Sequence, residues 1–98
     1  MKFEGKTWWS EDGKIKETII KEAILNNNSL SIDWGQKGNN AKLSSEDGLN
    51  FIGHFIENGY NKGRVWGKLF SHNDNYLLYA QYQDTYVSGI WICELNIS

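Results

Sequence analysis

Short runs in which apolar or aromatic residues alternate with polar ones constrain the fold of this chain more than any other feature. Clear cases are Ser29–Trp34 and residues 64–70. Alternation with a period of two places one set of side chains on each face of a β-strand. The five Trp, five Tyr and four Phe fall mostly in such runs, and these residue types favour a pleated, half-buried surface. The pattern predicts an all-β domain.

Turn residues separate these runs at short intervals. Asp12-Gly13 and Asn58-Gly59 supply the positive φ that tight hairpin turns require, and Lys62-Gly63 is interpreted as a further turn. The strands predicted between turns are 2–9, 15–25, 29–34, 41–44, 49–57, 63–71, 76–82 and 86–97. Many short strands joined by hairpins indicate an antiparallel meander of about eight strands. We expect it to form a small up-and-down barrel or a strongly curled sheet.

Residues 14–26 fit two different structures. Ile15, Ile19, Ile20, Ala23 and Ile24 would also lie along one stripe of an amphipathic helix. The density of β-branched residues, followed by three consecutive asparagines, favours a strand and a turn. The alternative to the all-β interpretation is therefore an α+β domain with a helix within 14–26.

Glycines and apolar residues inside the predicted strands lead to two expectations. Gly53, Gly67 and Gly89 lie within strands, where we expect them to let a small sheet curl tightly.

Several strands carry apolar residues on both faces, which a fully solvated outer face does not need. The outer face is expected to be covered or to pack on another subunit.

Length and charge limit the class of protein. A chain of 98 residues has room for one domain, spanning 1–98, with a modest core. The net charge is −2, and the segment up to Gly35 and the remainder each hold five basic and six acidic residues. Without a basic block, nucleic acid is not an expected partner.

The N-terminus lacks the apolar region of a signal peptide, and no stretch approaches the ~20 apolar residues of a spanning helix. We expect a cytoplasmic protein with no membrane partner.

No catalytic or metal-binding motif stands out. His54 and His72 come from different predicted strands and have no Cys or paired carboxylate at ligand spacing. Cys93 is the only cysteine, and its strand-like surroundings predict a small buried hydrophobe. A hydrolase would need two carboxylates facing one cleft, and most carboxylates lie in turns. We therefore expect no catalytic residue, no metal and no cofactor, and a hydrolase of unknown type is the last alternative.

Binding is the function that the aromatic residues favour. An apolar wall with a few polar groups is the usual lining of a small-molecule site. Arg64 is of interest because a guanidinium among aromatic rings can stack on them or hold an anion. The competing role for each aromatic residue is simply to fill the core. The residues predicted to line the pocket are Trp8, Trp34, His54, Arg64, Trp66, Tyr79, Gln81, Tyr82 and Trp91.

A few residues resemble the calycin group, which comprises lipocalins, fatty-acid-binding proteins and avidins. Phe3-x-Gly5-x-Thr7-Trp8 is similar to the first strand of that group, and Leu78-x-Ala80-x-Tyr82 and Gly89-x-Trp91 are similar to avidin strands. The resemblance implies an eight-stranded barrel around one small ligand. The first strand here has Gly-x-x-Trp where the group has Gly-x-Trp, and the resemblance transfers no binding residue.

The sequence thus leads to two main hypotheses of function. The first is a non-catalytic β-barrel that binds a small ligand in an aromatic-lined cavity. The alternative is a protein–protein interaction or homo-oligomerising module that uses an apolar outer face.

Overall fold

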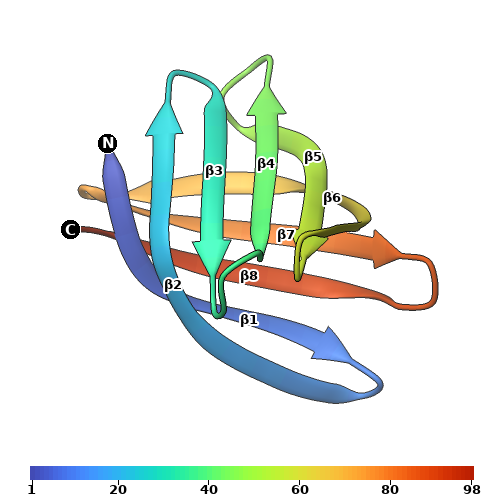
Figure 1. Cartoon of the computed structure of the whole chain (residues 1–98). Coiled ribbons are helices and arrows are strands. Elements are labelled where there is room, and N and C mark those ends of the chain that lie inside the picture. Colours follow the sequence, from blue (N-terminus) through green and yellow to red (C-terminus); the bar gives the residue numbers. More distant parts are fainter.

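The strands of this chain form a ring (Figure 1). The computed structural model describes residues 1–98 and contains eight antiparallel strands. Each strand pairs with the next along the chain, and the first pairs with the last, so the sheet is a closed barrel. The strands are β1 (Lys2–Glu11), β2 (Lys14–Asn26), β3 (Ser29–Trp34), β4 (Asn40–Ser45), β5 (Asn50–Glu57), β6 (Tyr60–His72), β7 (Asn75–Asp84) and β8 (Ser88–Ile97). The predicted all-β meander is confirmed. None of its elements is a helix that could span a membrane.

Tight turns with positive φ join several of the strands. Asp12 and Gly13 connect β1 to β2 with φ of 52° and 74°, and Asn58 and Gly59 connect β5 to β6 with φ of 52° and 82°. Positive φ at both central residues characterises the type I′ hairpin turn, which Asp-Gly and Asn-Gly pairs prefer. Both of these predicted turns are confirmed.

The predicted turn at Lys62-Gly63 is wrong. The chain has already reversed at Asn58-Gly59, so β6 begins at Tyr60 and residues 62–63 lie inside it. A register shift opposite Phe55 and Ile56 accommodates the extra residue. The predicted strand 86–97 begins at Ser88 instead, because residues 85–87 connect β7 to β8.

The helical alternative for residues 14–26 is wrong. This segment is β2, and it pairs with both β1 and β3. A register shift between Ile20 and Glu22 turns both Ile20 and Ala23 into the core, where they are 2% and 0% exposed. A spacing of three between buried residues is also helical. The bulge therefore explains the helical spacing of Ile20 and Ala23, whereas the other three residues of the stripe, Ile15, Ile19 and Ile24, are exposed.

Alternate side chains of each strand fill the barrel. The predicted common face of Leu30, Ile32 and Trp34 is confirmed as an inward face. Thr7 is the one polar residue among the buried ones, and its hydroxyl donates to the carbonyl of Ile92 at 2.9 Å. The buried apolar residues are Phe3, Ile20, Ala23, Leu30, Ile32, Trp34, Ala41, Leu43, Phe51, Phe55, Val65, Leu69, Leu78, Ala80, Tyr82, Trp91, Cys93 and Leu95.

Two inward-facing glycines lie where neighbouring strands come very close. A Cβ atom at Gly53 would overlap the carbonyl oxygen of Lys42, and one at Gly67 would overlap the backbone of Tyr79 and Ala80. Only glycine permits such an approach of one backbone to another. These positions fit the expected role of strand glycines in a sheet that must curl within a short chain.

Large apolar side chains also lie outside the barrel, on the sheet formed by β5 to β8. Phe70 and Leu77 are directly opposite each other across β6 and β7, and Ile52 is opposite Trp66 across β5 and β6. We call this surface the outer apolar face. Its members, each at least 36% exposed, are Ile52, Trp66, Phe70, Leu77, Tyr79 and Ile90.

Candidate functional site

One end of the barrel opens into a cavity that we call the aromatic hollow. Strands β1, β3, β5 and β7 end here and β8 begins here, because alternate strands of a meander run in the same direction. The cavity volume of the hollow is about 50 Å³, and it is about 480 Å³ when the space out to its open mouth is included. Its lining consists of Trp9, Glu11, Trp34, Phe55, Glu57, Tyr82, Asp84, Val87 and Trp91.

The lining has a deeper aromatic layer and a carboxylate layer nearer the mouth. At the ends of three strands, an aromatic residue is followed two positions later by an acidic residue. Residues two apart in a strand share a face, and each acidic residue is the last of its strand. The three pairs are Trp9 and Glu11 on β1, Phe55 and Glu57 on β5, and Tyr82 and Asp84 on β7.

The aromatic layer is held by contacts between its own rings. The ring centroids of Trp34 and Trp91 are 5.3 Å apart and the ring planes are tilted by 59°. Phe55 and Tyr82 meet edge to face, with centroids 5.9 Å apart and planes at 89°. Both geometries are favourable for aromatic pairs. The layer is therefore a preformed apolar floor built from strands that are distant in sequence.

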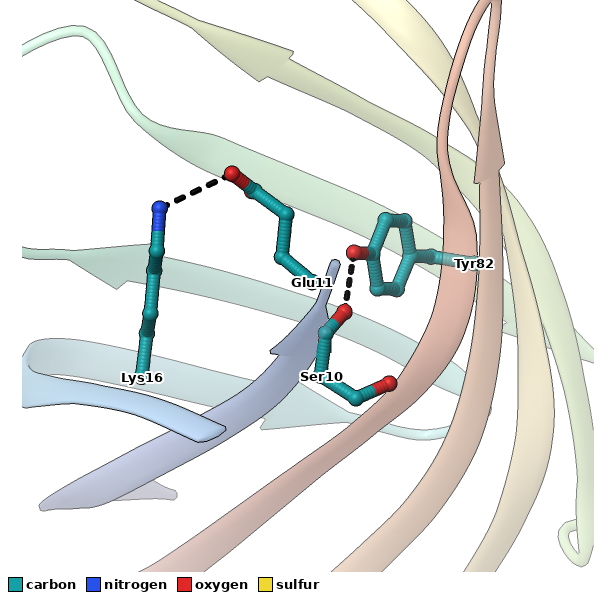
Figure 2. Close-up of polar contacts among 4 residues, drawn as sticks. All are labelled: Ser10, Glu11, Lys16 and Tyr82. Atoms are coloured by element: carbon teal, nitrogen blue, oxygen red, sulfur yellow. Dashed lines mark hydrogen bonds and ion pairs between the residues drawn. The ribbon is translucent and has the colours of Figure 1, made fainter. Parts of the chain in front are cut away.

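The side chain of Tyr82, on β7, is held in place by a hydrogen bond to β1. Figure 2 shows its hydroxyl donating to the backbone carbonyl of Ser10. Burial, reinforced by the negative charges of Glu11 and Asp84, raises the pKa of Tyr82 to about 12. The phenol is thus neutral and its proton is engaged within the protein.

The three carboxylates of the hollow have different surroundings. Lys16 Nζ lies 2.8 Å from Glu11 Oε2 (Figure 2), and this hydrogen bond raises the pKa of Lys16. Asp84 accepts a hydrogen bond from the backbone N–H of Tyr86 at 2.8 Å. Glu57 takes part in neither ion pair of the protein, and its burial raises the pKa of its carboxyl group. Glu57 is therefore the carboxylate left free to respond to a bound molecule.

The carboxyl groups of the hollow offer part of what a hydrolase would use. A carboxyl group of raised pKa is suited to general acid catalysis, and Glu57 has this property. A hydrolase also needs a nucleophile or base. Glu11 is paired with Lys16, and Asp84 accepts a backbone hydrogen bond from its turn. No group of three or more His, Cys, Asp or Glu side chains is arranged to hold a metal ion.

The structure brings only some of the nine predicted pocket residues together. Trp66 and Gln81 are cross-strand partners and, with Tyr82, line a second cavity on the outer surface. Trp34, Tyr82 and Trp91 line the aromatic hollow. Arg64, whose Nη2 is 3.4 Å from Gln83 Oε1, lies on the outer surface, away from the aromatic floor. The residues on the outside of the barrel are Trp8, His54, Arg64, Trp66, Tyr79 and Gln81.

Sequence reasoning missed six residues of the hollow. Trp9 lies inward and its neighbour Trp8 lies outward, where the Trp8 indole donates to Glu17 at 2.9 Å. The period-two pattern that starts at Phe3 and Thr7 contained the signal, since Trp9 continues it. The other missed residues are Glu11, Phe55, Glu57, Asp84 and Val87.

Comparison of the chain with protein-family models, with curated proteins and with solved structures finds no significant match. The resemblance to the calycin group stays a prediction.

Proposed function

We infer that this protein is a non-catalytic binding protein that takes one small molecule into the aromatic hollow. The observation that carries the proposal is the convergence of five aromatic side chains from five strands on one open cavity. Trp34, Tyr82 and Trp91 are each less than a tenth exposed, so the floor is largely preformed. Rigid aromatic floors with a few polar groups are typical of small-molecule sites.

Two further elements belong to the same proposal. Calycin-like ligand binding at one end of the barrel is supported by the closed meander of eight strands. A cytoplasmic location is supported by the single cysteine, which is buried and has no partner for a disulfide.

Two adjacent tryptophans provide a matched test. Protein purified gently from its own host is compared by native and denaturing mass spectrometry, together with the variants Trp9→Leu and Trp8→Leu. The wild type and Trp8→Leu are expected to carry an added mass that is lost on denaturation, and Trp9→Leu is expected to lose it. Near-UV circular dichroism verifies that each variant remains folded. Protein without added mass in every case, or equal retention by both variants, would contradict the proposal.

The outer apolar face supports a second candidate function, self-association through β5 to β8. Six large apolar residues are exposed there, and four of them form the cross-strand pairs Phe70–Leu77 and Ile52–Trp66. Exposed patches of this kind commonly mark interfaces. The occupant we propose is a second copy of the chain. Sedimentation of the wild type should show a dimer that Leu77→Glu dissociates. The control Ile15→Glu, at a 71% exposed position on another hairpin, should leave it intact, and a wild type that stays monomeric at high concentration would rule out this function.

A further inference from the structure

We propose that the aromatic hollow selects a small organic cation, an alkylammonium or quaternary ammonium ion. This inference rests on the proposed function and specifies the class of ligand. It follows from three features of the hollow: the charge of its mouth, the chemistry of its floor and its size.

The mouth of the hollow is negatively charged. Its lining includes Glu11, Glu57 and Asp84 and no Lys, Arg or His. The carboxylate of Asp12 and the ammonium groups of Lys16 and Lys62 also act on this region. Four carboxylates thus face two lysines, and one of those lysines is paired with Glu11. A cation is attracted to this end of the barrel, and an anion is repelled.

The floor of the hollow consists of aromatic rings. Trp9, Trp34 and Trp91 come from three different strands, and indole is the side chain that attracts a cation most strongly through its π face. Tyr82 adds a fourth ring, and its hydroxyl proton is already committed to Ser10. An anionic or strongly hydrogen-bonding ligand therefore lacks a phenolic donor here. A cation that carries methyl groups matches both the apolar surface and the quadrupoles of the rings.

The carboxyl group of Glu57 lies where it could form an ion pair with a cation bound in the hollow. Its carboxyl group is half-buried, belongs to no ion pair and lies two residues beyond Phe55 of the floor. The charged groups that act on it are Lys62, Asp84, Glu11 and Lys16. A bound cation would give Glu57 the direct ion pair that it now lacks, so cation binding should strengthen as pH rises and Glu57 loses its proton.

The size of the hollow fits the head group of such an ion. The 50 Å³ open to water-sized atoms corresponds to roughly three to five water molecules, at about 10–15 Å³ for each on this measure. A tetramethylammonium group has a comparable number of heavy atoms. A longer substituent would extend through the open mouth, past the carboxylates.

The test compares three probes of similar shape and different charge: choline, its neutral isostere 3,3-dimethyl-1-butanol, and the anion 3,3-dimethylbutanoate. Calorimetry and changes in tryptophan fluorescence report their affinities for the whole chain. We expect choline to bind at least tenfold more tightly than the alcohol and the anion to bind least. Equal affinity for choline and the alcohol, or a preference for the anion, would overturn the cation inference and leave the proposed binding function standing. Binding of none of the three would count against both.

A pair of variants tests the role of Glu57 separately. Glu57→Gln should weaken choline binding several-fold, leave binding of the alcohol unchanged and remove the pH dependence of choline affinity. The control Glu94→Gln changes an exposed carboxylate on β8, outside the hollow, and should change nothing. Unaltered choline affinity and pH dependence in Glu57→Gln would overturn the role of Glu57.

Discussion

Tyr82 on β7 reaches across β8 to the backbone of Ser10 on β1. Its hydroxyl donates to the Ser10 carbonyl, and it crosses β8 at Gly89, its partner in the β7–β8 ladder. The Ser10 hydroxyl accepts a hydrogen bond from the backbone N–H of Ile90 at 2.9 Å. These contacts join three strands at the wall of the aromatic hollow, next to the seam where the first and last strands meet.

Removing the Tyr82 hydroxyl should destabilise the protein modestly. Tyr82→Phe keeps the ring in the aromatic layer and loses one hydrogen bond, for a cost of about 1 kcal/mol in the free energy of unfolding. Urea denaturation measures the difference. The control Tyr79→Phe, on the outer face, should have almost no effect, and equal effects of the two substitutions would show that the bond to Ser10 contributes nothing.

A methyl group at position 89 should cost more than loss of the hydroxyl. A Cβ atom there would lie 2.6 Å from the Ser10 carbonyl oxygen and 3.1 Å from Tyr82 Cε1. Overpacking of this kind typically costs about 1–3 kcal/mol, so Gly89→Ala should shift the urea midpoint further than Tyr82→Phe does. The double variant should lose less than the sum of the two, because both changes disrupt the same contact. Strict additivity, or a loss no larger than that of the control Ser88→Ala, would refute this account.

Glu57→Gln should stabilise the protein at neutral pH. Burial raises the pKa of Glu57 in the folded state, so the fold disfavours its charged form. Such a group contributes fully to the free energy of unfolding at a pH below its pKa in the unfolded chain. That contribution is lost as the pH rises through its pKa in the folded protein. The neutral glutamine avoids this loss, and its advantage should disappear below about pH 4, where the unfolded carboxyl is also protonated. Thermal unfolding across this pH range, with Glu94→Gln as the control, tests the sign. A variant less stable than the wild type at pH 7 would contradict it.

Cys93 should resist alkylation in the folded protein. Its side chain is 0% exposed, and burial raises the pKa of the thiol to about 12. Because the thiolate is the reactive form, iodoacetamide at mildly alkaline pH should modify it only after unfolding in urea. A cysteine introduced by Ser98→Cys, at an exposed position, provides the reactive control. Modification of native Cys93 at the rate of that control would show that the interior opens readily.

The fold was predictable because alternation and turn chemistry agree along most of the chain. In Phe51-x-Gly53-x-Phe55, the period of two predicts one shared face, and Phe51 and Phe55 are both buried. The conflict at 14–26 arose because a bulge mimics a helical spacing at Ile20 and Ala23. A single extra residue in a strand changes which side chains point inward, and composition does not show where it lies.

The site was less predictable because alternation does not tell the inside of a barrel from the outside. On β6, the large side chain of Trp66 suggested that it lines a pocket. The structure places Trp66 on the outer surface, and Val65 and Leu69 are the buried residues of this strand. Glu57 and Asp84 each follow an inward aromatic residue by two positions, but that pattern becomes a site only when the register brings the strand ends together. Trp9 shares a face with Phe3 and Thr7, and the structure shows that this face is the inward one.

The pairing of β1 with β8 differs in kind from every other pairing in the ring. All the others join neighbours along the chain, whereas this one brings Phe3 beside Ile97. The entropic cost of closing a loop rises with its length, and this pairing closes the longest loop of the barrel, so the meander should assemble first and the seam should form last. Until then β1 and β8 present unpaired edges to other molecules, and self-association during folding should be governed by how quickly these two strands pair.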